Sequence, residues 1–386
     1  MTILWIYDMP LVPEAGGTER ITSLVSNGLI ERGYTCLGIL EFKQGTKMIT
    51  YKNIPIKDLY GFLKENKVDI VINQIAYSTW LLNDFLIQGG NRWHSEGGKI
   101  ISCLHFDPCN PSYIQLLKSQ DRLSFRNRLD IFKHSLLFPY YKHKKEQQEG
   151  NVYNYIYEHS DGFVILSDRH RSYLERVMKR NDYSKVIVIN NPLTFSHITA
   201  ETDLYNKKKT ILVCARMSEY HKRISLILKA WKVLQNEDEI KDWRLKIVGE
   251  GPDLDRYKLF VKKKRIANVE FYGRQDSLPF YQEASILLLT SSAEGWGLTI
   301  TEALQNGVVP IVMNSSPVYI DIIDNCHNGY LTPNGDISSF TRCIKSLISN
   351  PSRLHAMQCN ALASAHRFTI DKTLDKWEKI FRKTSE

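Results

Sequence analysis

Strands and helices alternate along nearly the whole chain, and this alternation restricts its fold more than any other feature. Apolar residues in Thr2–Tyr7 and Thr35–Phe42 indicate two buried strands, and residues 18–31 between them carry apolar side chains at helical spacing. These three segments form one strand–helix–strand unit. The pattern predicts an α/β fold with parallel sheets that helices cover on both faces. Further strands are predicted at Val68–Asn73, Lys99–Leu104, Gly162–Leu166, Val186–Ile189, Thr210–Ala215, Arg244–Val248, Val269–Tyr272, Ile286–Thr290 and Val308–Val312.

The chain has 386 residues, which is more than one core usually holds, so two domains are expected. The alternation breaks at residues 190–209, where Asn190-Asn191-Pro192 precedes a polar stretch that ends in three lysines. We therefore predict a Rossmann-like domain over residues 1–190 and a second over residues 205–369, each with its own sheet.

The net charge is +9, which suits phosphorylated substrates, an anionic membrane surface or nucleic acid. The basic residues form no known nucleic-acid reader motif, so nucleic acid is not expected. The seven cysteines are odd in number and include no Cys-x-x-Cys, which argues against a disulfide framework or a zinc site and favours a reducing cytoplasm. No apolar run approaches the ~18–20 residues of a membrane span.

Residues 118–146 depart from the alternation because basic side chains are interleaved with aromatic and aliphatic ones. The segment has eight Lys and Arg residues against three Asp and Glu. Such a helix can lie on an anionic bilayer, or it can be a solvated helix that packs on its own domain. Both interpretations stay open at this point.

The segment Glu294-Gly-Trp-Gly-Leu-Thr-Ile-Thr-Glu302 is the strongest indication of function. A predicted strand ends at Thr290, a glycine-containing loop follows, and a helix begins at Thr299. In an open α/β sheet, ligands bind beyond the carboxyl ends of the strands, and a helix N-terminus favours a phosphate. Glu294 and Glu302 are suited to accept hydrogen bonds from sugar or ribose hydroxyls. Thr299-x-x-Glu302 is also a capping box, so Glu302 has the alternative role of capping the helix.

A basic loop runs from Arg216 to Arg223, after the predicted strand at residues 210–215. Lys222 and Arg223 precede a predicted helix, where the macrodipole disfavours cations unless an anion binds beside them. Arg216 stands at the carboxyl end of the strand. The loop predicts an anion site, and a solvent-exposed basic turn is the alternative.

Three further features carry weaker signals. Gly16-Gly17 precedes the first helix and can hold a phosphate or a sugar, or simply make a turn. His105 follows a predicted strand and either faces a ligand at that edge or is structural. Asp253-Leu-Asp255 looks like a metal-binding pair, but acids also suit the start of a helix, so no metal is expected.

In this order the motifs resemble those of family 4 glycosyltransferases with the GT-B architecture. The resemblance covers nearly the whole C-terminal half, and in the N-terminal half it rests on the glycine loop and His105. Asn190-Asn191-Pro192 departs from the more usual Pro-Asn-Gly, and Trp296 is bulkier than the residue expected there. The matching residues are Gly16–Arg20, Ile189–Pro192, Arg216 with Lys222-Arg223, Leu245–Pro252, Val269–Gly273, Glu294-x7-Glu302 with Gly307, and Asn328–Leu331.

The resemblance implies two Rossmann-like domains that face a cleft, and a last helix in residues 370–386 that crosses back to the N-terminal domain. It implies a retaining transfer from a nucleotide sugar without a metal. Arg216 and Lys222 would bind the diphosphate, Glu294 the donor sugar and Glu302 the ribose, while His105 would contact that sugar or the charge developing on it. The other donor-binding residues that it implies are Gly16, Gly17, Gly273, Arg274, Gly295, Trp296, Gly297, Leu298 and Thr299.

These observations predict a retaining hexosyl- or N-acetylhexosaminyltransferase that uses a UDP-sugar. The expected acceptor is a glycan or a lipid-linked sugar of surface polysaccharide or lipopolysaccharide synthesis, and the expected location is the cytoplasm or the inner face of its membrane. A glycosidase pair of Glu294 and Glu302 is disfavoured because the two acids stand beside a phosphate-type loop. A sugar-nucleotide epimerase of the same fold and a non-catalytic UDP-sugar-binding subunit remain as alternatives.

Overall fold

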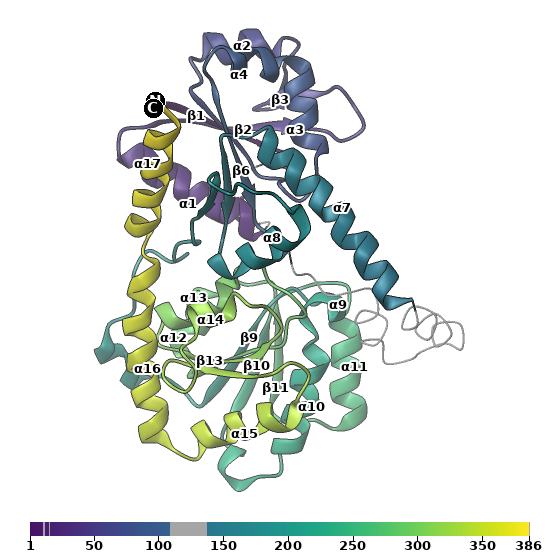
Figure 1. The fold of residues 1–386 in the computed structure, drawn as a ribbon. Coiled ribbons are helices and arrows are strands. Elements are labelled where there is room, and N and C mark those ends of the chain that lie inside the picture. The colour runs from purple at the N-terminus through teal and green to yellow at the C-terminus, as the bar shows by residue number, and fades with distance from the viewer. Residues whose placement is uncertain (11, 15, 109–136, 386) are drawn as a thin grey trace. The chain divides into compact units, whose positions relative to one another are not determined.

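The chain folds into two compact units, shown in Figure 1. The computed structural model describes residues 1–10, 12–14, 16–108 and 137–385. Of these, unit 2 contains residues 195–367, and unit 1 contains all the others. Within these described residues, the chain crosses between the units at 194–195 and at 367–368. Next to both crossings, the backbone N–H of Leu193 donates a hydrogen bond of 2.8 Å to the carbonyl of Phe368.

Unit 1 is built on an eight-stranded sheet with the order β4-β3-β2-β1-β5-β6-β7-β8. The pairs from β2 to β8 are parallel, and the central strand β5 is buried at every position, as expected of an apolar run that helices cover on both faces. The strands are β1 (Thr2–Tyr7), β2 (Thr35–Phe42), β3 (Ile49–Tyr51), β4 (Ile54–Pro55), β5 (Ile70–Asn73), β6 (Lys99–Leu104), β7 (Gly162–Ile165) and β8 (Val186–Val188).

The sequence did not predict β3 and β4, which extend this sheet as an antiparallel hairpin. The two strands are short, and the alternation of apolar runs therefore gives no signal for them. Their turn is Lys52-Asn53, and both residues have a positive φ, of 50° and 64°. This geometry matches the two-residue turns that follow the right-handed twist of a hairpin.

The C-terminal helix α17 (Ile370–Ser385) belongs to unit 1 and lies beside α1 (Gly17–Glu31), as Figure 1 shows. Gly28 of α1 gives the Leu374 side chain room for a close approach. Arg32 binds Asp371 and Asp375. The other helices of this unit are α2 (Leu59–Glu65), α3 (Trp80–Phe85), the π-helix Leu86–Gly90, α4 (Asn91–Ser95), α7 (Phe138–Glu158), the 3₁₀ turn Asp168–His170 and α8 (Arg171–Met178).

Unit 2 contains six parallel strands in the order β11-β10-β9-β12-β13-β14. Numbered from β9, this is the 3-2-1-4-5-6 order of the doubly wound fold, and its topological switch point lies between β9 and β12. The predicted α/β fold is therefore confirmed. The strands are β9 (Thr210–Cys214), β10 (Arg244–Val248), β11 (Val269–Gly273), β12 (Ile286–Leu289), β13 (Val309–Asn314) and β14 (Tyr330–Pro333).

The helices of unit 2 enclose a core around the fully buried Trp231. Residues 195–204, which the sequence left between the two predicted domains, belong to this unit. The Gln305 amide donates to the carbonyls of Phe195 and His197, and Leu204 is buried. The helices are α9 (Glu219–Lys222), α10 (Ile224–Leu234), α11 (Leu254–Lys264), α12 (Leu278–Glu283), α13 (Leu298–Gln305), α14 (Tyr319–Ile322), α15 (Ile337–Ile348) and α16 (Pro351–Ala365), with 3₁₀ turns at Glu201–Asn206, Asp238–Ile240 and His366–Phe368.

The basic and aromatic segment is described only in part. Residues 118–136 lie outside the described residues, and residues 138–146 form the first turns of α7. Among the helices that are described, none has both the length and the apolar character that a bilayer span requires.

Candidate functional site

The switch point of unit 2 brings two predicted loops together. One loop follows β9 and continues through α9, and the other follows β12. The Thr290 hydroxyl donates to the Lys222 carbonyl over 2.9 Å, and the Ser292 N–H donates to the His221 carbonyl over 2.7 Å. The loops are therefore held to each other by hydrogen bonds that no periodic pattern in the sequence reveals.

Arg223 clamps these two loops from one side. Its Nε donates to the Thr290 carbonyl over 2.6 Å, and its Nη2 donates to the Ser291 carbonyl and to Asn334 Oδ1, each over 2.7 Å. Burial lowers the pKa of Arg223. The alternative that this residue belongs to a solvent-exposed basic turn is therefore wrong, because its guanidinium is committed to the loop after β12.

Lys222 and Glu294 form an ion pair across the same two loops. Their side chains are 23% and 16% exposed, so the pair is shielded on most sides but remains open to a ligand. The Ser316 hydroxyl donates to the Glu294 carbonyl over 3.0 Å and fixes the backbone beneath the carboxylate. A cation and an acceptor of hydroxyl protons thus stand side by side at the carboxyl edge of the sheet.

Arg216 adds a second cation to this edge and is exposed. Burial is the main cause that lowers the pKa of His221, and the charges of Lys222 and Arg216 lower it further, while Glu294 acts in the opposite sense. All three predicted charged residues therefore lie close enough to act on one imidazole ring. The excess of positive charge suits a bound anion.

The helix N-terminus of α13 completes this edge. Its N-cap is Gly297, with φ of 92°, and the cap provides no side-chain hydrogen bond. The first turn of α13 has no acidic residue, so the N–H groups of Leu298 and Thr299 keep the partial positive charge of the helix end. A phosphate group fits such a terminus.

Glu302 faces the interior instead of the helix N-terminus. It is 2% exposed, and Tyr281 Oη donates to its Oε2 over 2.9 Å. The capping-box alternative is wrong, because Gly297 is the N-cap and Thr299 lies inside the helix. Burial, and then the carboxylate of Glu302, raise the pKa of Tyr281.

Trp296 also turns inward. Its side chain is 2% exposed, so the ring packs within unit 2. Residues 295–297 therefore offer only their backbone at the surface of this loop. The extra bulk of this indole is therefore buried within unit 2.

Gly249, which follows the neighbouring strand β10, supports the loop of Arg216. Gly249 has φ of 133°, and a side chain there would overlap the carbonyl oxygen of Ala215. Its N–H donates to the Gly273 carbonyl over 2.7 Å, which links this turn to β11. Gly273 has φ of 67°, and Arg274 after it is exposed. Gly273 thus borders the loop of Arg216 through its bond with Gly249.

Asp253 of the apparent metal-binding pair has a structural role. Asp253 Oδ2 accepts from the backbone N–H of Glu219 over 2.8 Å, and its Oδ1 accepts from Arg256. Within the described part of the chain, no group of three or more His, Cys, Asp or Glu side chains is arranged to hold a metal ion.

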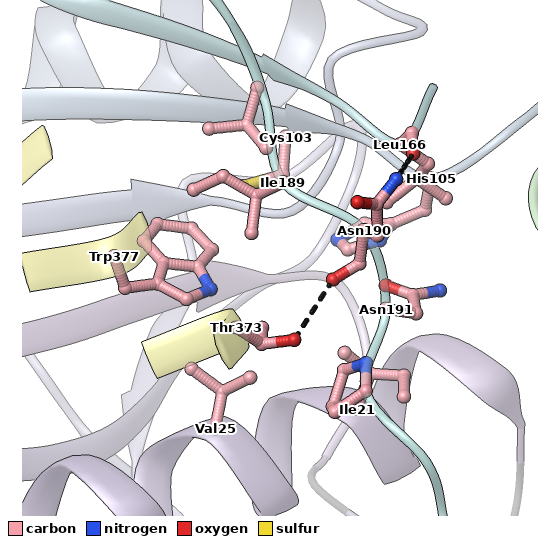
Figure 2. A pocket seen from close by; sticks show the side chains of 12 residues that line it. Ile21, Val25, Cys103, His105, Leu166, Ile189, Asn190, Asn191, Thr373 and Trp377 are labelled. Carbon is pink, nitrogen blue, oxygen red and sulfur yellow. Dashed lines mark hydrogen bonds between the residues drawn. The ribbon is translucent and has the colours of Figure 1, made fainter. Parts of the chain in front are cut away.

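His105 and the glycine loop of unit 1 lie on the carboxyl edge of the other sheet. His105 Nε2 bonds to Gln74 Oε1, and burial lowers the pKa of His105 to about 4. Its ring also lines a small cavity, shown in Figure 2, together with apolar side chains of α1 and α17 and the Asn190-Asn191 turn. Asn190 is held there by bonds to Leu166 O and from Thr373 Oγ1.

Gly16 is the N-cap of α1, but its backbone is extended, so no left-handed conformation explains the glycine. A side chain at Gly16 would meet the Glu19 carboxylate, which folds back over the start of the helix and is buried. The start of α1 therefore already carries a negative charge, and it suits a sugar hydroxyl better than a phosphate. Gly17 is the first residue of the helix.

Two α/β units of this kind constitute the GT-B fold. Residues 195–363 match the family model described as glycosyl transferases group 1. A crystal structure of Anabaena HepE in complex with UDP has a TM-score of 0.70 to this chain at 15% identity, and the alignment covers 99% of this chain and 100% of that one. This likeness establishes the fold.

Two curated proteins are similar in sequence over part of their length. An uncharacterized glycosyltransferase of Haemophilus influenzae is 30% identical over 222 residues, which are 57% of this chain and 61% of that protein. A lipopolysaccharide 1,6-galactosyltransferase of Escherichia coli is 27% identical over 205 residues, 51% of this chain and 55% of that protein. The alignments thus span a little more than half of the length of these relatives.

Proposed function

We propose that the chain is a glycosyltransferase that moves a sugar from a nucleoside diphosphate sugar to a hydroxyl of a glycan or lipid-linked acceptor. The observation that carries this proposal is the switch point of unit 2. There, Lys222 is paired with Glu294, Arg216 adds a second cation, and α13 presents an acid-free N-terminus. The match of residues 195–363 to the glycosyl transferase model supports the same conclusion.

The three features suit different parts of one donor. Lys222, Arg216 and the N–H groups of α13 would hold the diphosphate and stabilise the charge that develops as it leaves. The Glu294 carboxylate would accept bonds from hydroxyls of the sugar. Glu302 would hold the ribose, with its buried carboxylate accepting both from a ribose hydroxyl and from Tyr281. Gly273 and Arg274 would lie near the base.

We propose a retaining reaction with a UDP-sugar and no metal. The acceptor hydroxyl would attack the face that the leaving phosphate departs from, and that phosphate would take its proton. The two cations beside the donor would supply the charge that a metal ion supplies elsewhere. UDP is bound by HepE, and the E. coli relative acts on lipopolysaccharide, which makes a UDP-hexose and a surface glycan the first substrates to test.

We further propose that unit 1 contacts an anionic membrane at the start of α7, on the cytoplasmic side. Leu137, Phe138, Tyr140 and Tyr141 are exposed there, with Tyr140 at 61%, and three lysines follow within the next four residues. Exposed aromatic groups beside cations are typical of helices that lie at a bilayer surface.

A thermal-shift screen of the purified protein over nucleotide sugars tests the donor. The true donor is expected to raise the melting temperature as its occupancy increases. Free UDP that appears only after an acceptor is added would reject the epimerase alternative. If the protein binds a UDP-sugar but never releases UDP, whichever acceptor extract is added, the non-catalytic subunit is favoured and the proposal is contradicted.

A further inference from the structure

A buried hydrogen-bond chain links the first turn of α1 to His105 in unit 1. Thr22 Oγ1 donates to the Thr18 carbonyl over 2.8 Å, and Gln74 Nε2 donates to Thr22 Oγ1 over 3.0 Å. Gln74 Oε1 then bonds to His105 Nε2. Thr22 and Gln74 are 3% and 4% exposed, so water does not compete for these bonds.

The donor and acceptor roles along this series of hydrogen bonds follow from the first bond, between Thr22 and Thr18. Two oxygen atoms 2.8 Å apart need a hydrogen between them, and the Thr18 carbonyl has none. The single hydroxyl hydrogen of Thr22 is therefore committed to Thr18, and Thr22 can only accept from Gln74. The amide NH₂ of Gln74 consequently points to Thr22, and its oxygen points to His105.

An amide oxygen has no hydrogen to give, so His105 Nε2 must carry the proton. In a neutral imidazole the other nitrogen, Nδ1, then holds a lone pair. Within the described part of the chain, His105 Nδ1 makes no hydrogen bond with another residue. Burial keeps this ring neutral at pH 7, since the pKa of His105 is lowered to about 4.

We propose that Gln74 is a positioning residue, which holds His105 as the Nε2–H tautomer and thereby makes Nδ1 an acceptor for a hydroxyl of the substrate. The use of Nδ1 rests on the proposed glycosyl transfer, whereas the tautomer itself does not. A neutral acceptor suits this reaction because positive charge develops on the sugar ring, and an imidazolium at the same place would repel it.

The topology explains why Gln74 can act in this way. β5 and β6 are adjacent and parallel, with Asn73 in register with Ser102, so the residues just beyond their carboxyl ends meet. β1 and β5 flank the point where the strand order of this sheet reverses, which is where ligands bind in open α/β sheets. The series of hydrogen bonds thus connects His105 to α1, the helix that follows the predicted glycine loop.

The tautomer can be read directly in the free protein by long-range ¹H–¹⁵N spectroscopy of the histidine rings, with the His105→Gln variant used for assignment. The expected spectrum shows a protonated Nε2 and an unprotonated Nδ1 for His105 at pH 7. In Gln74→Leu the ring should lose this preference. In Thr22→Val, which keeps the shape but removes the hydroxyl, the preference should weaken. A protonated Nδ1 in the native protein, or a spectrum unchanged in Gln74→Leu, would overturn the proposal.

Kinetics test the use of the tautomer in the reaction. Gln74→Leu is expected to lower kcat roughly 10–100-fold, as loss of a residue that orients a functional histidine does elsewhere, with a smaller change in KM. Wild-type kcat in a Gln74→Leu variant that has lost the tautomer would refute the positioning role. Absence of sugar transfer by the native protein would instead refute the proposed function and leave the spectroscopic result standing.

Discussion

Lys222 and Glu294 form an ion pair although 72 residues separate them in the chain. The pair exists because β9 and β12 are neighbours in the sheet while being distant in sequence. Each residue holds the other in place while a ligand is absent. A diphosphate that binds Lys222 would therefore compete with Glu294 for it and would free that carboxylate for the sugar.

Lys222→Met should weaken UDP binding by about tenfold or more, which corresponds to ~1.4 kcal/mol. The reason is the loss of a partly buried cation at the predicted diphosphate position. Isothermal titration calorimetry measures the affinity, and Lys262→Met on the exposed face of α11 is the matched control. Equal affinity in the two variants would contradict the assigned role.

Glu294→Ala should lower turnover by roughly 10²-fold or more while the protein stays folded, because an acceptor for the sugar hydroxyls is lost from the site. Turnover is measured as UDP release with donor and acceptor present, and circular dichroism verifies the fold. Glu239→Ala, at an exposed turn of the same unit, should have no effect. Near-normal turnover of Glu294→Ala would remove this residue from the site.

Gly249→Ala should destabilise the protein by about 3 kcal/mol or more, because the new Cβ would overlap the Ala215 carbonyl in addition to a strained φ. Gly335→Ala is the control, since Gly335 has φ of 82° but no atom within 4 Å of the added Cβ. It should cost only the ~1–2 kcal/mol of the left-handed backbone. Denaturant unfolding compares the two, and similar losses would show that the contact with Ala215 does not matter.

Tyr281→Phe should destabilise the protein by about 1–3 kcal/mol, because the buried Glu302 carboxylate loses a hydroxyl donor. Tyr205→Phe is expected to be nearly neutral, since Tyr205 is 82% exposed. Thermal unfolding measures both. A neutral Tyr281→Phe would mean that other groups satisfy Glu302 and that the bond from Tyr281 adds nothing to stability.

Replacing Lys142, Lys144 and Lys145 with Glu should reduce binding to vesicles that contain phosphatidylserine, and the difference should shrink at high salt. Co-sedimentation measures the bound fraction. The control replaces Lys262, Lys263 and Lys264 of α11, which carry the same charge but have no exposed aromatic cluster before them. Equal losses would indicate a general charge effect, and no loss would return the start of α7 to a solvated helix.

The sequence predicted every parallel strand except the short β14, and both loops of the switch point, because buried runs and glycines leave local signals. It missed the β3–β4 hairpin, whose strands are too short to show periodicity. It also missed Tyr281 and Gln74, since each is singled out only by a bond to a residue that is distant in the sequence. The roles assigned to the predicted site residues stay predictions.

Arg223 also shows that the sequence alone does not predict which partner a side chain binds. Its place before a helix suggested either an anion site or an exposed turn, and the structure shows a third use as a clamp on the loop after β12. Glu302 is similar, since its spacing from Thr299 fits a capping box while its side chain binds inside the unit. Spacing along the chain specifies which residues can reach a place, whereas the partner they find there depends on the rest of the fold.

Within the described residues, unit 2 is one continuous segment, 195–367, and α17 of unit 1 follows it in the chain. During synthesis, unit 2 can complete its six-stranded sheet as soon as residue 367 has emerged. Unit 1 must wait longer, because Trp377 and Phe381 of α17 fill its core last. Unit 2, which we propose to bind the donor, would thus mature on the ribosome before the unit that holds His105, and the proposed transfer would not begin until α17 docks.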